Sequence, residues 1–521
     1  MLNYFLYSSF GKSELSSHFS GFAYNSRSLI LDKEGAEGFV EKYGFEELAK
    51  LQGQFCSLVK EKDSFYLITD ILGSEPVFYY SSSQGWAFSN SLYHLAQHLI
   101  DNKVSLSIND SVAEYFGLKY SLCEQLIGPQ TFVREIFLMM QGEMLQIDTD
   151  SSLNAVAVSL IKTPNKKSYK KKSYSGCVVD GVREVGNVLH TLEKLYPGSI
   201  SIDLTGGVDS RVVFGIASRA LESIDKIHVT SSVNQKRDYE VAKKITKYFD
   251  IKLDNRKPSV IKNDELSYKT WKAFNLGVYA PISKPVLSPN RHEWFHVHGG
   301  AGEVLRSFYP NSPSKTVDVL EKKFGCDLQG LRMIMKEFCE LRGLDFNCKS
   351  SMSSIYLESR SRIHFGRPSF CHSLHRVFMP LANVNFMEAA QKLSHEELSR
   401  SKVLFDILSA TAPELLGFDY DDDRKTLKGR VDRGLSALVS LINFKPLKIY
   451  GSGKKDHCSF VSKHDKSFSS FLVSDLELCE RFVDFPDLSV ANNLKSDYNR
   501  GIMMRKEIHC CLFSKLFYAV D

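Results

Sequence analysis

The sequence predicts an α/β protein with two kinds of sheet, and three observations support this fold class. Short strand-like segments separated by turn signals fill roughly the first 150 residues, which is typical of antiparallel sheets packed face to face. From residue 199 onward strands alternate with helices, which indicates a parallel sheet covered by helices. From about residue 316 to the end helical spacing dominates, with a polar break at residues 444–457, so we expect a helical C-terminal part.

Composition limits the classes of function. The chain of 521 residues is 43% hydrophobic, enough for two or three domains with their own cores. Its formal charge of +5 is spread along the chain, so we expect no nucleic-acid partner. The eleven cysteines include no C-x-x-C pair, which favours a reducing, cytoplasmic location and predicts no zinc site. Because no signal peptide and no apolar run of roughly 18 to 20 residues is present, we expect no membrane association.

The strand-rich part contains three apolar segments bounded by turn residues. They are residues 55–59, 64–68 and 77–80. The basic stretch at 165–173 has the composition of a solvated linker, although a nucleic-acid or acidic-peptide patch is an alternative. The expected organisation is an N-terminal domain over 1–160, a basic linker over 161–176 and a second domain over 177–521.

The parallel sheet is predicted from the order of elements after the linker. Apolar residues at helical spacing indicate a helix over residues 178–195. The following segments are predicted as the strand 199–202, a helix through 211–217, the strand 226–230 and a helix from about 237 to 249. Ligands of such sheets bind beyond the carboxyl ends of the strands, so we expect the functional residues there.

The most informative segment is the loop after the first of these strands. It reads Leu204-Thr205-Gly206-Gly207-Val208-Asp209-Ser210 and leads directly into a helix. Backbone N–H groups at a helix N-terminus attract phosphate, and Gly206 and Gly207 permit positive φ and a close approach of the ligand. Thr205 and Ser210 add hydroxyl donors, and Asp209 is suited to hold a divalent ion. The segment resembles the S-G-G-x-D-S pyrophosphate loop of ATP pyrophosphatases, so ATP and Mg²⁺ are the expected cofactors; a plain glycine turn is the alternative.

A second glycine-rich segment extends the resemblance. Residues 297–306 read V-H-G-G-A-G-E-V-L-R and are similar to the second nucleotide loop of the asparagine synthetase superfamily, G-x-G-x-D-E-x-x-x-G-Y. In the N-terminal part, segments at 51–55, 70–80 and 86–90 resemble the glutaminase-like domain of the same superfamily. The resemblance covers most of the chain. It implies an Ntn-type αββα sandwich followed by an adenine-nucleotide α-hydrolase (ATP pyrophosphatase) domain.

The resemblance also implies the other residues of a nucleotide site. The further residues expected to contact ATP are Thr230, Ser231, Gly299, Gly300 and Arg306. Gly302 stands where an Asp usually precedes Glu303, which leaves Asp209 and Glu303 as the expected metal ligands. Arg306 is expected to neutralise phosphate in place of the lost acid. Asp238, at the start of the helix after the second strand, is interpreted as complementing the helix dipole.

The expected catalytic residues are Glu303 and Lys425. The resemblance implies that Glu303 ligates metal or helps to activate the amine. It also implies a lysine that stabilises charge in the transition state of acyl attack, with Lys425 as the first candidate and Lys428 or Lys448 as substitutes. A surface lysine beside a run of acids is the alternative for Lys425.

The glutaminase-like part lacks the nucleophile that the superfamily uses. Active members have a cysteine directly after the initiator Met, whereas this chain has Leu2, and its first cysteine is Cys56 in a predicted strand. We therefore expect a glutaminase fold without glutaminase activity. Exposure of Ser8 or Ser9 by processing is the less favoured alternative.

Together these motifs imply an ATP-dependent, AMP-forming amide ligase. It would adenylate a small-molecule or peptide carboxylate and couple it to an amine from a source other than glutamine cleaved by the same chain. Specialised-metabolite, lasso-peptide and surface-polysaccharide biosynthesis are the expected settings, with a partner protein from the same pathway as a further expectation. Two alternatives stay open: a tRNA-modifying ATP pyrophosphatase, and a non-catalytic partner that keeps the fold.

Overall fold

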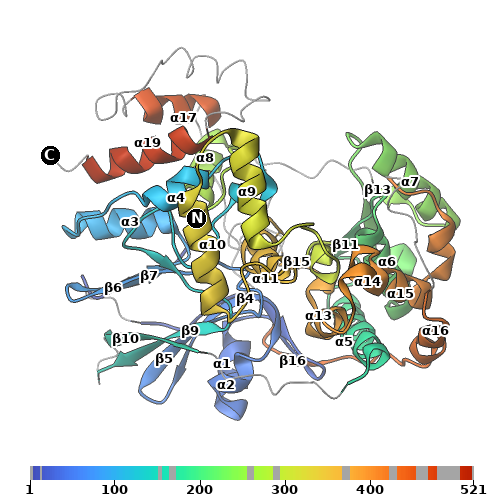
Figure 1. Ribbon diagram of the computed structural model, residues 1–521. Coiled ribbons are helices and arrows are strands. Elements are labelled where there is room, and N and C mark those ends of the chain that lie inside the picture. The colour runs from blue at the N-terminus through green and yellow to red at the C-terminus, as the bar shows by residue number, and fades with distance from the viewer. Residues whose placement is uncertain are drawn as a thin grey trace.

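Three sheets organise the described part of the chain (Figure 1). The computed structural model describes residues 4–11, 15–150, 155–162, 172–254, 263–285, 294–365, 376–421, 431–452, 468–477 and 505–518. Two of the sheets are built from antiparallel strands, apart from one parallel pair at an edge, and the third is wholly parallel. The α/β class with both kinds of sheet is therefore confirmed.

The two antiparallel sheets pack face to face in the N-terminal part. The smaller has the order β1 (Leu6–Ser8), β7 (Gly85–Ser89), β6 (Phe78–Ser82), β8 (Phe137–Leu138). The larger has the order β10 (Ala155–Lys162), β9 (Glu143–Thr149), β5 (Ser64–Thr69), β4 (Gln52–Glu61), β2 (His18–Tyr24), β3 (Ser28–Ile30), β16 (Lys448–Tyr450). Side chains alternate along β4, so that Cys56 and Leu58 enter the core between the sheets while Phe55 and Val59 face outward.

Helices cover the outer face of each antiparallel sheet. Helices α1 (Lys33–Tyr43) and α2 (Phe45–Leu48) pack on the larger sheet, and α3 (Leu92–Asp101) packs on the smaller one, with α4 (Asp110–Tyr115) in the same core. The layers are thus helix, sheet, sheet and helix. The C-terminal helices α17 (Phe468–Glu477) and α19 (Arg505–Tyr518), red in Figure 1, lie beside α3 and α8 (Asp264–Asn275). Within the described segments, no helix combines the length and the apolarity that crossing a membrane requires.

The parallel sheet forms the other half of the molecule. Its order is β13 (Leu253–Asp254), β12 (His228–Thr230), β11 (Ile200–Asp203), β14 (Phe295–Val297), β15 (Arg376–Phe378). Helices α5 (Tyr174–Leu195), α6 (Val208–Ala220), α13 (Val384–Ala390) and α15 (Lys402–Thr411) share one core with its apolar face, and α7 (Lys236–Tyr248) flanks it. The helices and strands predicted between residues 178 and 249 are confirmed.

The remaining helices surround these sheets. They are α9 (Pro313–Phe324), α10 (Gln329–Leu341), α11 (Ser351–Tyr356), the π-helical turn η4 (Leu357–Phe365), α14 (His395–Ser399) and α16 (Arg433–Ser440). Short 3₁₀ turns are η1 (Ser121–Glu124), η2 (Ile224–Lys226), η3 (Gly302–Leu305), η5 (Pro380–Ala382) and η6 (Pro413–Gly417). Helices α9, α10 and α11 share a core with α3 and α4, which attaches the C-terminal part to the N-terminal sandwich.

Strand β16 corrects the sequence prediction for residues 444–457. Instead of forming only an irregular break, this stretch contains Lys448–Tyr450, which pairs in parallel with β3 and extends the larger antiparallel sheet. Its last carbonyl accepts the backbone N–H of Leu31 at 3.2 Å. The strand therefore joins the C-terminal part of the chain to the N-terminal sandwich by backbone hydrogen bonds.

A buried carboxylate marks a second junction between the halves. Glu184 on α5 accepts amide N–H groups from Gln52 on β4 at 2.7 Å, from Asn383 at 2.8 Å and from Asn385 at 3.0 Å. Buried carboxylates need such donors because an unpaired charge is costly away from water. Nearby, the ring of Phe22 on β2 meets Phe295 and Phe378 of the parallel sheet at centroid distances of 5.6 and 5.4 Å. The two halves consequently share a core.

Candidate functional site

The predicted nucleotide residues meet at the carboxyl edge of the parallel sheet. The first glycine loop follows β11, Thr230 and Ser231 end β12, and the second glycine loop follows β14 and leads into η3. The backbone N–H of Leu204 donates to the carbonyl of Thr230 at 2.9 Å, so the first two strand ends are hydrogen-bonded to each other. Lys425 and Lys428 lie outside the described residues. Lys448 lies on β16, at the edge of the larger antiparallel sheet and not at this edge.

Hydroxyl groups hold the shape of the first loop. The Oγ of Ser210 accepts the backbone N–H of Thr205 at 3.0 Å and lies 2.9 Å from Thr205 Oγ1, which in turn accepts the N–H of Gly207 at 3.3 Å. Gly207 is the N-cap of α6 and has φ −77°. The loop does not use the positive φ that glycine permits at 206 and 207, because neither backbone enters the left-handed region. Among the described residues, no side chain makes a capping hydrogen bond at the N-terminus of α6.

Gly206 is required by the protein chain that packs on it. Its N–H donates to Asp238 Oδ1 at 2.7 Å, and its carbonyl accepts the N–H of Asp421 at 3.2 Å. A Cβ at Gly206 would lie 2.6 Å from the Cβ of Asp421, too close to be accommodated without a shift. Asp238 thus contacts the loop directly, which goes beyond the dipole role expected for it.

Arg211 fixes the segment that covers this loop, and sequence reasoning missed it. Its side chain is fully buried in the first turn of α6, and its guanidinium lies 3.8 Å from the centre of the Tyr420 ring. The guanidinium donates to four backbone carbonyls, those of Gly206 (3.2 Å), Leu415 (3.1 Å), Phe418 (3.0 Å) and Asp419. The only sequence signal was a single cation at the head of an otherwise apolar helical run.

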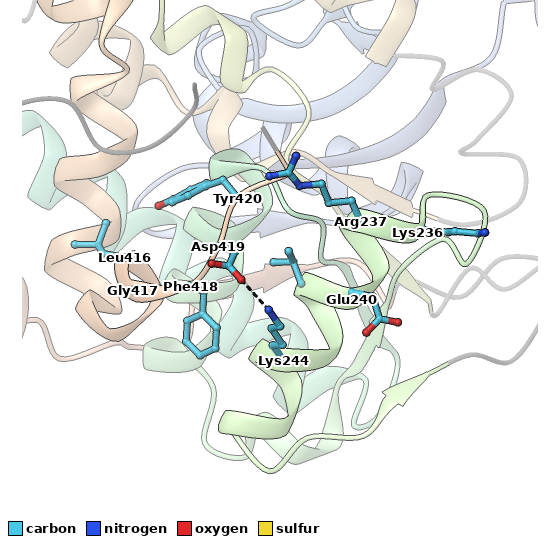
Figure 2. Close-up of a pocket in the computed structure, with 10 residues that line it drawn as sticks. Lys236, Arg237, Glu240, Lys244, Leu416, Gly417, Phe418, Asp419 and Tyr420 are labelled. Atoms are coloured by element: carbon cyan, nitrogen blue, oxygen red, sulfur yellow. Dashed lines mark hydrogen bonds and ion pairs between the residues drawn. The ribbon is translucent and has the colours of Figure 1, made fainter. Parts of the chain in front are cut away.

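A cleft adjoins the covering segment. Figure 2 shows its walls, the N-terminal half of α7 on one side and residues 416–420 on the other. The cleft has a volume of about 760 Å³ and is bordered by the cations Lys236, Arg237 and Lys244. Lys244 pairs with Asp419 at 2.7 Å across it. Because the same segment continues to Asp421, the cleft and the first loop share one wall.

The second glycine loop packs directly against the first. A Cβ at Gly299 would lie 2.8 Å from the backbone nitrogen of Ser210, and a Cβ at Gly302 would lie 2.3 Å from Asp209 Oδ1. Between them, Ala301 adopts the left-handed conformation with φ +64°. Glycine is therefore required at 299, where a side chain would meet backbone atoms, whereas at 302 a side chain would meet the end of the Asp209 side chain. An aspartate at 302, as the superfamily pattern has it, would displace the carboxylate of Asp209.

Asp209 and Glu303, together called the acid pair below, are brought together around Arg306. The Nη2 of Arg306 lies 2.9 Å from Asp209 Oδ2 and 3.5 Å from Glu303 Oε1, and the three side chains are 15 to 20% exposed. Burial lowers the pKa of Arg306, but the two carboxylates outweigh it and raise that pKa. In the described ranges, no group of three or more His, Cys, Asp or Glu residues is arranged to hold a metal ion. This arrangement does not fit Mg²⁺ held between the acid pair, because a guanidinium lies between the carboxylates.

A histidine cluster lies below the second loop, and it was also missed from the sequence. His296 Nε2 is 3.1 Å from Asp203 Oδ2, and its Nδ1 is 3.1 Å from Ser201 Oγ. Loss of hydration raises the pKa of Asp203, but His296 outweighs this effect and lowers that pKa to about 2. Burial lowers the pKa of His298 to about 4, and this neutral ring accepts the N–H of Gly300 at 2.9 Å. The H-x-H spacing at the end of β14 was the available signal.

The residues considered for glutaminase chemistry are held within the sandwich. Cys56 is fully buried between the sheets, and burial raises the pKa of its thiol well above the usual value. Ser8 is buried on β1 and lies 2.7 Å from His98 Nε2, and the Oγ of Ser9 accepts the backbone N–H of Trp86 at 2.9 Å. A buried, protonated thiol is a poor nucleophile, so the described structure gives Cys56 no catalytic role.

Comparison with known proteins leaves the site to be interpreted from its geometry. A scan against protein-family models finds no match to the chain, and a search of the curated proteins finds no relative. What the site offers is a hydroxyl-bonded glycine loop at a helix N-terminus, a second glycine loop in contact with it, and an arginine on an acid pair.

Proposed function

We propose that the chain is an ATP-dependent, AMP-forming amide ligase of the asparagine synthetase type. The observation that carries the proposal is the direct contact of the two glycine loops, in which Gly299 and Gly302 lie against Asp209 and Ser210. Two distant segments, each predicted to bind phosphate, meet at the edge where ligands of parallel sheets bind. On this proposal the N-terminal layers are an Ntn-type sandwich, and the parallel sheet belongs to an ATP pyrophosphatase domain.

The proposed reaction has two steps. A carboxylate oxygen of the substrate attacks the α-phosphorus of ATP, and the bond from that phosphorus to the bridging oxygen breaks, so that pyrophosphate leaves. An amine nitrogen then attacks the acyl carbon, loses a proton and expels AMP. The backbone donors at the start of α6 and the guanidinium of Arg306 bind the leaving pyrophosphate. Thr230 and Ser231 lie where the nucleoside enters, and Lys425 is proposed to meet the developing oxyanion.

The nitrogen is proposed to come from an amine other than glutamine bound by the same chain. Cys56 is buried and its thiol is protonated, which supports a sandwich without glutaminase activity. The acyl substrate is then a small-molecule or peptide carboxylate of a biosynthetic pathway. A location in the cytoplasm, where ATP is available and thiols stay reduced, agrees with the unbridged, buried thiols of Cys56, Cys123 and Cys177.

Nucleotide binding tests the first half of the proposal. The analogue α,β-methylene-ATP cannot be cleaved between its α and β phosphates. We expect it to bind to one site per chain, as measured by calorimetry. Ser210→Ala removes the hydroxyl that closes the loop and should weaken binding at least about tenfold. Ser218 lies on the same helix and its hydroxyl, among the described residues, bonds only to the carbonyl of Gly215, so Ser218→Ala should leave binding unchanged. Equal binding by both variants would place the nucleotide elsewhere.

Product analysis tests the second half. Purified protein is incubated with ATP, candidate carboxylates and hydroxylamine, which traps acyl-adenylates as hydroxamates. The expected products are AMP, pyrophosphate and hydroxamate, and Asp209→Ala should abolish them while the circular dichroism spectrum stays unchanged. Formation of ADP, or of glutamate from added glutamine, would contradict the proposal.

A second candidate function is a non-catalytic partner that keeps the nucleotide fold. The arrangement that favours it is the neutralisation of the acid pair by Arg306, because these carboxylates are the expected metal ligands. This candidate predicts that α,β-methylene-ATP binds while no carboxylate supports AMP formation. Hydroxamate formation with any carboxylate would exclude it.

A further inference from the structure

Arg306 contacts the acid pair through a single nitrogen. Both ion pairs, 2.9 Å to Asp209 and 3.5 Å to Glu303, start from Nη2. A guanidinium carries five N–H donors in a fixed plane, and the hydrogen bond that Arg306 makes among the described residues uses neither Nε nor Nη1. Asp209 also belongs to the first turn of α6, whose uncapped N-terminus is the predicted phosphate cradle. The guanidinium therefore sits beside the place where pyrophosphate is proposed to bind.

The two carboxylates of the acid pair need a positive charge between them. Two carboxylates that share a partly buried site repel each other unless a cation lies between them, and either a metal or an arginine can supply that charge. Here the arginine supplies it, because Nη2 of Arg306 lies 2.9 Å from Asp209 Oδ2 and 3.5 Å from Glu303 Oε1. A third acid at position 302 would displace the Asp209 carboxylate, because its Cβ would lie 2.3 Å from Asp209 Oδ1.

We propose that Arg306 is the resident cation of this site and takes the place of a protein-bound divalent ion. The guanidinium neutralises Asp209 and Glu303 permanently and leaves its free edge for an anionic ligand. Pyrophosphate then binds without a metal ion held by the acid pair. The choice of pyrophosphate as ligand rests on the proposed function, whereas the exclusion of metal from the acid pair does not.

Metal binding without nucleotide tests the resident cation. Mn²⁺ is titrated against the full chain and followed by electron paramagnetic resonance. The wild type should show no site that depends on Asp209, and Arg306→Ala should gain one Mn²⁺ site at least about tenfold tighter than any in the wild type. That gain should disappear in Arg306→Ala/Asp209→Asn. Arg306→Lys, which keeps a cation, should still exclude Mn²⁺.

Arg332 provides a matched control. Its Nη2 bridges Asp318 at 2.8 Å and Glu321 at 2.9 Å on the surface, so Arg332→Ala also frees two acids, but at a more exposed place. This variant should gain no comparable Mn²⁺ site. The proposal is overturned if the wild type binds one Mn²⁺ that is lost in Asp209→Asn, or if Arg306→Ala folds as the wild type does and gains none.

Inorganic pyrophosphate separates this inference from the proposed function. We expect the wild type to bind it in the presence of EDTA, and Arg306→Ala to bind it at least about tenfold more weakly. Binding that appears only with Mg²⁺ would overturn the metal-free part of the inference. If pyrophosphate binds under neither condition while the Mn²⁺ results hold, the proposed function fails and the resident cation stands.

Discussion

Three buried or half-buried polar side chains are satisfied by three different kinds of partner. Arg211 donates to backbone carbonyls, Arg306 contacts carboxylates, and Glu184 accepts from side-chain amides. A charged side chain that loses its partners in such surroundings destabilises the fold. The partner groups also destabilise it when they stay buried after the charged side chain is removed. At the scale of single residues, therefore, we expect a large loss of stability when one of these side chains is replaced. We expect a small loss when a similar residue with fewer partners is replaced.

Arg211→Met removes the donors of four carbonyls while keeping most of the side-chain volume. We expect the free energy of unfolding to fall by about 3 kcal/mol, because the carbonyls stay buried without donors. Arg219→Met is the control, since Arg219 on the same helix donates, within the described part of the chain, only to the carbonyl of Val439, at 3.3 Å. Its loss should stay below about 1 kcal/mol. Denaturant unfolding measures both, and equal losses would contradict the anchoring role of Arg211.

The pair of Asp203 and His296 predicts how stability depends on pH. Burial opposes the charged form of His296, but Asp203 outweighs it and raises the pKa of His296 in the folded state. Because this pKa exceeds the unfolded value of about 6.5, the stabilisation is complete below that pH and is lost as the pH rises through the folded pKa. The contribution of Asp203, with its pKa lowered to about 2, is lost only as the pH falls below about 4.

Thermal unfolding at a series of pH values checks whether the pair loses its stabilising effect as the pH rises. As the pH rises from about 6 to 9, the melting temperature of the wild type should fall relative to that of His296→Gln. His395→Gln, at an exposed histidine at the start of α14, should follow the wild type throughout. A constant difference between wild type and His296→Gln over that range would show that the pair does not titrate there.

At the scale of elements, the sequence predicted the parts whose signal is local. Apolar residues at helical spacing predicted α5, and its residues Val178, Val182 and Val185 do face the core. Strand β16 could not be predicted, because a three-residue strand has no periodicity and exists only by pairing with β3. Both glycine loops were found from their residue types, since a loop between a strand and a helix keeps its order along the chain.

The contacts that complete the site join residues far apart in the sequence, which is why they were missed. Gly206 was expected to let phosphate approach the backbone, and the structure shows that the approach of Asp421 also requires a glycine there. Asp209, Glu303 and Arg306 were all named from the sequence. That the arginine contacts both acids is a property of the tertiary structure, because it requires the second loop to pack on the first.

Gly207→Ala tests the first loop as a binding element. A Cβ at this position would meet only Thr205 Oγ1, at 3.5 Å, and φ −77° suits alanine, so the fold should be unaffected. Pyrophosphate at the N-terminus of α6 would collide with the added methyl group, so its binding, measured by calorimetry, should weaken at least about tenfold. Gly417→Ala, where an added Cβ meets nothing within 4 Å, is the control. Unchanged binding by Gly207→Ala would move the phosphate site away from this loop.

At the scale of the molecule, the two halves are joined by strand pairing, a shared core and the amides on Glu184. Helix α1 supports this junction, because a Cβ at Gly35 would lie 2.3 Å from the carbonyl oxygen of Tyr450. Tyr450 also packs its ring against Phe39 of the same helix, with centroids 5.4 Å apart. The seam between the N-terminal sandwich and β16 therefore depends on a glycine one turn into α1.

Gly35→Ala should push β16 away from β3 and lower the free energy of unfolding by about 2 kcal/mol. Gly38→Ala, in the same helix, meets nothing within 4 Å and should be neutral or stabilise the protein by up to about 1 kcal/mol. Urea unfolding compares the two variants. Similar stabilities would show that the seam tolerates displacement.

The pairing of β16 with β3 also sets an order of assembly. The N-terminal sandwich receives its last strand from residues 448–450, so during synthesis the edge of β3 stays without its neighbour until most of the chain has been made. An open strand edge is a site of mispairing with other chains, and contacts between distant residues form slowly. The nascent protein is therefore most prone to aggregate through β3 just before its C-terminal part emerges, when protection by a chaperone has the largest effect on yield.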